Sequence, residues 1–230
     1  LNELGASAVV FDMVFSQPDR LSPKSLRKML PKRPEFEAAR EGLLEIPDND
    51  ELFAQTIDGA YVVTGFAMTG GKTTEAAPAI KAGFAENGDR AAPYLPAYSG
   101  AMKVLSNIEE KAAGNGALNA IPESDGVYRR IPMFVTLSDK IYPSLVAESL
   151  RVAQDASTFI IQAVGASGEE GFGETGLVSF KVGAVKVPTD ENGQIWVRFT
   201  GDIPERYVPA WKLLDGSAPA EKLEGHIVLI

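Results

Sequence analysis

The spacing of apolar residues along this chain predicts strands that alternate with helices. Apolar runs of strand length occupy six segments, namely Ala8–Phe15, Tyr61–Met68, Val127–Val135, Val178–Val187, Ile195–Thr200 and His226–Ile230. Helical patterns occupy five others, namely Glu35–Leu44, Asp50–Ile57, Met102–Ala113, Ser144–Ala153 and Arg206–Leu214. This order predicts an α/β fold, a single domain over residues 1–230 in which helices flank a β-sheet.

Turn-forming residues predict one β-hairpin in the C-terminal part. Residues 188–193 (Pro-Thr-Asp-Glu-Asn-Gly) lie between two strand candidates, and the Asn-Gly pair favours positive φ. A hairpin beside strands that are joined through helices makes the predicted sheet mixed. The long stretches 18–33 and 69–100 are rich in Pro, Gly, Lys and Ala, and we expect them to be surface excursions or lids.

One carboxylate, Asp12, stands in the middle of the first apolar segment. Burial of an unpaired carboxylate is costly, so we expect an arginine to meet Asp12 if the segment is a core strand. The candidates are Arg129 and Arg130, which follow the Asp125-Gly126 turn at the start of another strand. Because adjacent strand residues point to opposite faces, only one of them can face Asp12, and the sequence leaves open which. Such a pair either neutralises a buried charge or belongs to a ligand site.

Composition excludes several kinds of site. The chain holds 22 Lys and Arg against 31 Asp and Glu, a net charge of −9, which argues against nucleic acid and anionic membrane surfaces as partners. It has no cysteine and one histidine, His226, so disulfides, zinc sites built on Cys and His, and a cysteine nucleophile are excluded. We predict no metal site, no cofactor and no catalytic residue.

Three motif-like segments are better explained by local structure. Residues 65–73 resemble a phosphate-binding loop, but Phe66 stands where the first glycine of that loop belongs. Residues 171–176 match G-x-G-x-x-G, but a strand pattern follows where a dinucleotide site needs a helix. Asp48 with Glu51 three residues later is typical of a helix N-cap rather than of a calcium loop.

Several short patterns, taken in order, resemble a family of sensory domains. They are Gly5-Ala6-x-x-Val9-x-Phe11-Asp12 leading into Phe15 and Pro18-Asp19, Asp50-x-x-Phe53-Ala54 before Val62-Val63, Asn119 followed by Asp125-Gly126-Val127-x-Arg129, Pro143-Ser144-Leu145, and Leu223-x-Gly225-x-Ile-Val-Leu-Ile. Their order and spacing along the whole chain are similar to the type-two CHASE family, the cyclase/histidine-kinase-associated sensory extracellular domains of bacterial membrane receptors.

The resemblance implies a periplasmic sensor domain of a receptor in the bacterial inner membrane. Since residues 1–5 have the pattern of a last helical turn and residues 226–230 that of a strand, we expect a fragment whose flanking membrane helices and output domain are absent. The implied output is an adenylate or diguanylate cyclase or a protein kinase. The implied receptor is a homodimer that responds to an unknown small molecule or a periplasmic partner, and touches the membrane only through those helices.

The resemblance also implies a set of pattern residues. They are Asp12, Asp19, Asp50, Asp125, Gly126 and Arg129, and with Arg130 the charged members form the candidate ligand-binding or structural polar cluster. Two alternatives remain open. One is an α/β hydrolase-type enzyme that uses carboxylates such as Asp12 and Asp19. The other is a dimerisation module with the long loops as its contact surface.

Overall fold

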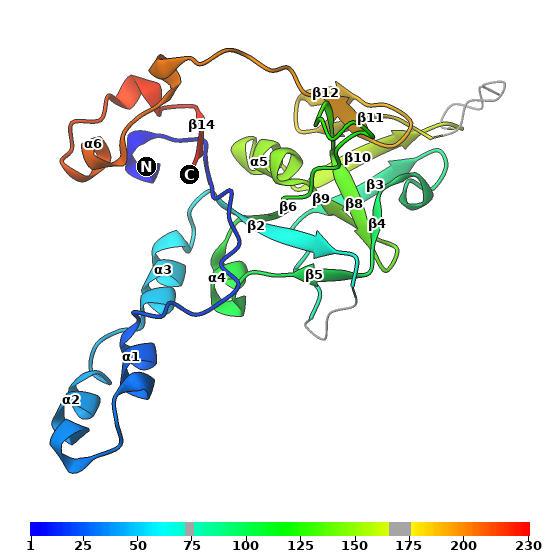
Figure 1. Cartoon of the computed structure of the whole chain (residues 1–230). Helices are drawn as coiled ribbons and strands as arrows, with labels where there is room; N and C mark the ends of the chain where they lie inside the picture. Colours follow the sequence, from blue (N-terminus) through cyan, green and yellow to red (C-terminus); the bar gives the residue numbers. More distant parts are fainter. Residues whose placement is uncertain (72–75, 166–175) are drawn as a thin grey trace.

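The computed structural model describes residues 1–71, 76–165 and 176–230, and its centre is a sheet with helices on both faces (Figure 1). The helices are α1 (Pro23–Met29), α2 (Glu37–Gly42), α3 (Asn49–Ile57), α4 (Ser106–Lys111), α5 (Leu145–Ala153) and α6 (Ala210–Leu214). Short 3-10 helices cover Asn2–Leu4, Pro34–Phe36, Ala92–Tyr94, Pro204–Arg206 and Ala220–Lys222. The strands are β1 (Ala8–Val10), β2 (Val62–Thr69), β3 (Gly83–Asn87), β4 (Ala97–Tyr98), β5 (Gly100–Met102), β6 (Gly114–Ala117), β7 (Arg130–Pro132), β8 (Phe134–Leu137), β9 (Lys140–Pro143), β10 (Thr158–Ala163), β11 (Leu177–Val182), β12 (Val185–Pro188), β13 (Gln194–Trp196) and β14 (Ile227–Leu229).

The central sheet joins β14, β1, β2 and β5 in that order, and β6 also pairs with β2. All pairs in it are parallel except β2–β5. Val9 and Val62 pack with α3 and α4, whereas their neighbours Val10 and Val63 pack with α5 on the opposite face. A sheet that is buried on both faces explains why these strands are apolar without alternation.

A second sheet has the strand order β12-β11-β10-β3, and a small β4-β8-β9 sheet contributes to the same core. Phenylalanine rings fill this core. The ring of Phe134 lies 5.2 Å from that of Phe159 and 5.0 Å from that of Phe180, both edge to face. All three side chains are buried, so this cluster joins the two sheets through aromatic packing.

Two glycines of β6 let helix α5 approach the central sheet closely. A Cβ added at Gly116 would lie 2.5 Å from the Cα of Leu145, and one at Gly114 would lie 2.8 Å from a methyl group of Val152. The side chain of Ser144 caps this helix, because its Oγ accepts a hydrogen bond from the Ala147 amide at 3.2 Å. The predicted N-cap at Ser144 is therefore confirmed.

The predicted α/β class with a mixed sheet is confirmed, and so are the strand at residues 61–68 and the helices at 50–57 and 144–153. The Asp48 cap is also confirmed, since its carboxylate accepts from the Asp50 amide at 3.1 Å. The stretches expected to be irregular excursions contain α1 within 18–33 and β3 and β4 within 69–100. Residues 72–73 of the first glycine motif and 171–175 of the second lie outside the described residues, although β11 does follow at Leu177.

The predicted position of the hairpin is wrong. The hairpin joins β11 to β12, within the segment that was expected to form one strand, and it turns at Gly183, whose φ is +52°. The next strand, β13, pairs instead with β7, which precedes it by about 60 residues in the register Trp196 to Arg130. Two residues are enough for a tight turn, and β11 and β12 are joined in this way. The longer segment at residues 188–193 leads the chain instead to β13, in another sheet.

Candidate functional site

The expected pairing of Asp12 with an arginine is wrong. Strand β1 ends at Val10, and the Asp12 side chain is exposed. Its amide donates a hydrogen bond to the Ile230 carbonyl at 3.0 Å, so Asp12 lies beside the end of β14. A hydrated carboxylate needs no counter-ion, which removes the reason for the pairing. Arg129 and Arg130 have other partners.

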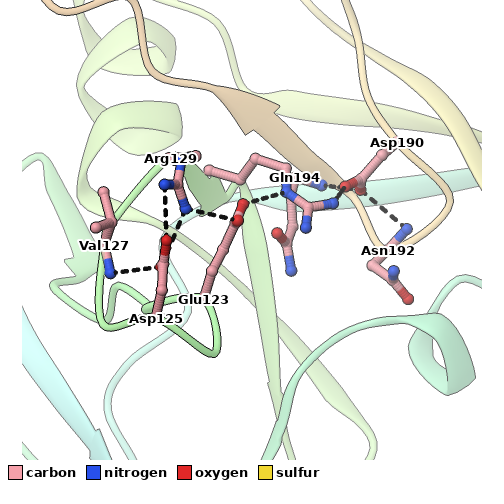
Figure 2. Close-up of polar contacts among 8 residues, drawn as sticks. Glu123, Asp125, Val127, Arg129, Asp190, Asn192 and Gln194 are labelled. Atoms are coloured by element: carbon pink, nitrogen blue, oxygen red, sulfur yellow. Dashed lines mark hydrogen bonds and ion pairs between the residues drawn. The ribbon is translucent and has the colours of Figure 1, made fainter.

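With those partners, the two arginines form an ion-pair cluster at the start of β7 (Figure 2). Arg129 donates hydrogen bonds to the Asp125 carboxylate from both terminal nitrogens, at 3.0 and 2.7 Å, and one to the Glu123 carboxylate at 2.9 Å. Arg130 contacts Glu123 at 3.3 Å and Asp190 at 3.1 Å. Glu123 therefore bridges the two arginines, and Asp190 connects this cluster to the loop that precedes β13.

The loop at Asp190 is itself closed by hydrogen bonds. The Asp190 Oδ1 accepts from the amides of Asn192, at 3.0 Å, and Gln194, at 2.8 Å, as Figure 2 shows. Arg130 also lies over the ring of Trp196, 5.4 Å from its centre, and Trp196 is the residue paired with it across β7 and β13. The cluster thus fastens two turns to one two-stranded sheet.

The pKa shifts of Asp125, Arg129 and Arg130 all favour the charged form. The hydrogen bond from Arg129, then that from the Val127 amide, lowers the pKa of Asp125. The bonds to Asp125 and Glu123 raise the pKa of Arg129, and the bond to Glu123 raises the pKa of Arg130. Acid–base catalysis needs a group that titrates near the working pH, so these shifts suit a structural clamp or an ionic binding surface instead.

A second polar group ties Asp19 to the start of α3. The Asp19 amide donates to the Asp50 carboxylate at 2.9 Å, and the Asn49 side-chain amide donates to the Asp19 carboxylate at 2.7 Å. The hydrogen bond from Asn49, followed by that from the Leu21 amide, lowers the pKa of Asp19. We call this group of Asp19, Asn49 and Asp50 the α3 clamp.

A third polar group is buried and was not predicted. Arg151 donates two hydrogen bonds to Glu148, at 2.8 and 2.7 Å, and Glu148 is 0% exposed. Glu148 also accepts from the Asn115 amide at 3.2 Å. The Asn115 side chain donates to Glu109 at 2.9 Å, and Glu109 pairs with Lys103 at 3.1 Å. This buried network connects α4, β6 and α5 behind the central sheet.

The first and last strands of the chain lie side by side at the edge of the central sheet (Figure 1). Beyond the ladder, the Ser7 amide donates to the His226 carbonyl at 2.9 Å and the Gly225 amide donates to the Gly5 carbonyl at 2.8 Å. An open hollow of about 470 Å³ adjoins this pair of segments. Its lining includes Asn2, Ser7, Tyr61, Val152 and Asp155, from the N-terminal segment, the start of β2 and the end of α5.

The whole chain, residues 1–230, matches the family model of the CHASE2 domain. The chain belongs to the CHASE2 family. CHASE2 domains are extracellular sensory modules of membrane-bound signalling receptors, and they are not catalytic. No curated protein and no solved structure matches this CHASE2 domain.

Two further findings concern membrane-spanning helices and groups of possible metal ligands in this CHASE2 domain. In residues 1–71, 76–165 and 176–230, no helix is long and apolar enough to cross a membrane. Over the same ranges, no group of three or more His, Cys, Asp and Glu side chains is placed to hold a metal ion.

The CHASE2 pattern residues fall into separate groups in the structure. Asp125 and Arg129 lie in the ion-pair cluster with Arg130, whereas Asp19 and Asp50 lie in the α3 clamp. Sequence reasoning missed Glu123 and Asp190. Their signals were a carboxylate two residues before the Asp-Gly turn and an Asp that opens an Asp-x-Asn-Gly turn.

We expect Arg129→Gln to raise the pKa of Asp125 toward its ordinary value of 3.8, because Arg129 supplies the largest part of the shift. A lowered carboxyl pKa stabilises the fold fully above the ordinary value and loses that contribution as the pH falls through the folded-state pKa. The measurement is an NMR titration of the Asp125 carboxyl carbon. Arg130→Gln is the matched control, since Arg130 contacts Glu123 and Asp190 rather than Asp125. An unchanged titration in Arg129→Gln would contradict the assignment.

Proposed function

We propose that this CHASE2 domain is the periplasmic input of a homodimeric receptor in the bacterial inner membrane. Binding of a small molecule or a periplasmic partner changes the activity of an intracellular adenylate cyclase, diguanylate cyclase or protein kinase. The single observation that carries the proposal is the pairing of β1 with β14, which couples the two terminal segments of the domain by backbone hydrogen bonds.

This pairing supports signal transfer because the two segments cannot move independently. β1 is bonded to β14 on one edge and to β2 on the other, and α5 packs on β1 and β2. A movement of α5 or β2 is therefore passed on to β1 and β14 together, and through them to both ends of the chain. Coupling free energies of about 1–3 kcal/mol are typical of such linked equilibria.

The hollow beside these segments is the place where a ligand would act most directly. Its lining joins the N-terminal lead to β1, through Asn2 and Ser7, to the end of α5, through Val152 and Asp155. A ligand that contacts both sides favours one spacing between them over another. Unequal affinity for the two spacings is the requirement for a binding event to shift a conformational equilibrium.

A reversible tether between the terminal segments tests the proposal. The chain has no cysteine, so Ser7→Cys with His226→Cys introduces a single possible disulfide between neighbouring backbones. In membranes that contain the full-length receptor, we expect the basal cyclase or kinase activity to differ between the oxidised and reduced double variant. The single variants should show no such difference, because neither can form the intramolecular bond. Equal activity in both redox states, with the disulfide verified, would refute signal transfer through these strands.

A further inference from the structure

Residues 20–40, which we call the basic arm, carry a charge opposite to that of the rest of the chain. They hold seven of the 22 Lys and Arg residues and two of the 31 Asp and Glu residues. The basic arm therefore carries a net charge of +5, and the remainder carries −14, which together give the −9 of the whole chain. Residues 20–33 alone contain six basic residues and no acidic one.

The basic arm, which contains α1 and the start of α2, projects from the body of the domain (Figure 1). In the described part of the chain, it contributes no residue to the four apolar core clusters. Its base is fixed by the α3 clamp and by Ser22, whose Oγ accepts from the Asn49 amide at 3.0 Å. Within the arm, Arg40 donates to the carbonyls of Arg27 and Leu30 at 3.0 and 2.9 Å. The arm is thus an ordered, anchored projection.

Most basic side chains of the arm form no ion pair within the part of the chain that the structure describes, and two of its large apolar side chains are exposed. Of the six basic residues in 20–33, only Arg33 has an ion-pair partner among the described residues, Glu35 at 3.9 Å. Leu21 and Met29 are 72% and 74% exposed. A hollow of about 500 Å³ opens beside Lys32 and Arg40. Apolar contact points with a charged surround are typical of protein interfaces.

We infer that the basic arm is the surface through which two copies of this domain pair, each arm docking on the acidic body of the other copy. This deepens the proposed receptor, and rests on it, by naming the contact between its protomers. The second copy offers the opposite charge, −14 outside its own arm. It also offers exposed apolar side chains around α6, where Trp211 is 58% and Leu214 is 88% exposed.

The placement of the arm favours a partner molecule over a contact within one chain. The arm projects away from its own body, as Figure 1 shows, and contacts at its base fix it there. Its positive charge is therefore available to the acidic body of a second molecule. In the same view, the arm lies at the lower left and the α6 segment at the upper left. A two-fold exchange of arms would use the same surface on both protomers, as closed dimers do.

Sedimentation equilibrium of the 230-residue domain tests this inference. We expect a dimer whose affinity falls as the salt concentration rises, because exposed charges are screened. Three exposed arm lysines without ion pairs can be reversed together, as Lys24→Glu, Lys28→Glu and Lys32→Glu. We expect this variant to dimerise at least about tenfold more weakly. The matched control reverses three exposed lysines outside the arm, Lys140, Lys181 and Lys186, with the same change in net charge, and should dimerise as the unaltered domain does apart from general repulsion.

Three outcomes would overturn the inference. They are an unaltered domain that stays monomeric at every concentration, equal weakening by both triple variants, and a monomeric domain whose arm lysines bind phosphatidylglycerol vesicles. Circular dichroism of both variants confirms that each is folded. Because the measurement involves no output domain, its failure leaves the proposed input function standing. A domain that dimerises through the arm in a receptor insensitive to the terminal tether would instead refute the input function alone.

Discussion

Arg151→Met is expected to lower the free energy of unfolding by about 3–5 kcal/mol, because it leaves the fully buried carboxylate of Glu148 without its counter-ion. Arg151 also donates to the carbonyls of Ala156, at 2.7 Å, and Ala113, at 2.9 Å, so the substitution leaves two further acceptors unpaired. For a chain of this length, the melting temperature should fall by about 6–20 °C. Urea denaturation and calorimetry measure the two quantities.

The control for this effect is Arg129, an arginine whose ion pairs lie at the surface. Arg129→Met removes contacts to Glu123 and Asp125, yet its side chain is 39% exposed and water replaces the lost partners, so its effect should be much smaller. Removing both buried charges together, in Glu148→Leu with Arg151→Met, should recover part of the loss. A single Arg151→Met variant as stable as Arg129→Met would show that the buried pair contributes little.

The same ion pair explains one limit of prediction from sequence. Spacing on α5 correctly predicted a helix, but it does not show which of its polar residues are buried. In the structure, Val146 is 50% exposed and Glu148 is 0% exposed. Glu148 is buried because Arg151 one turn later and the Asn115 amide of β6 both meet it. Partners from another strand, brought together only by the fold, decide which polar residue can be buried.

The error at Asp12 has a related cause. The predicted core strand holds for Ala8–Val10, which are buried, but beyond it Phe11, Val14 and Phe15 are only partly buried and Met13 is exposed. Phe11 and Phe15 pack edge to face against one another at 5.4 Å, and both contact Phe53 of α3, at 5.5 and 5.2 Å. These rings lie beyond the end of β1, so the run continues as a loop that covers a helix. Asp12 is therefore free to face solvent.

Net charge gives an incomplete picture, since it averages over surfaces that differ. The value of −9 argued against nucleic acid and anionic membrane surfaces as partners, but it does not reveal that residues 20–33 hold six basic side chains and no acidic one. Where each charge lies relative to the body depends on which segments project, and this was visible only in the structure. For binding partners, the distribution of charge matters more than its sum.

Gly116→Ala is expected to lower the free energy of unfolding by about 3 kcal/mol, and the melting temperature by about 6–12 °C. The added Cβ would lie 2.5 Å from the Cα and 2.8 Å from the amide nitrogen of Leu145, so backbone on α5 or β6 has to move. Gly42→Ala is the matched control. A Cβ there meets nothing within 4 Å, and alanine favours the helix, so that variant should be unchanged or slightly more stable.

A pair of rescue variants separates this backbone clash from a side-chain clash. The three atoms nearest to a Cβ at Gly65 all belong to the side chain of Leu118, at 2.8–3.0 Å, so Leu118→Ala should relieve part of the cost of Gly65→Ala. Leu145→Ala should not relieve Gly116→Ala, because the obstructing Leu145 atoms belong to its backbone. A favourable coupling energy between Gly116→Ala and Leu145→Ala would contradict the packing described. Helix α5 also packs on β1 and lines the neighbouring hollow, so where Gly116→Ala displaces α5 rather than β6, the wall of that hollow moves with it.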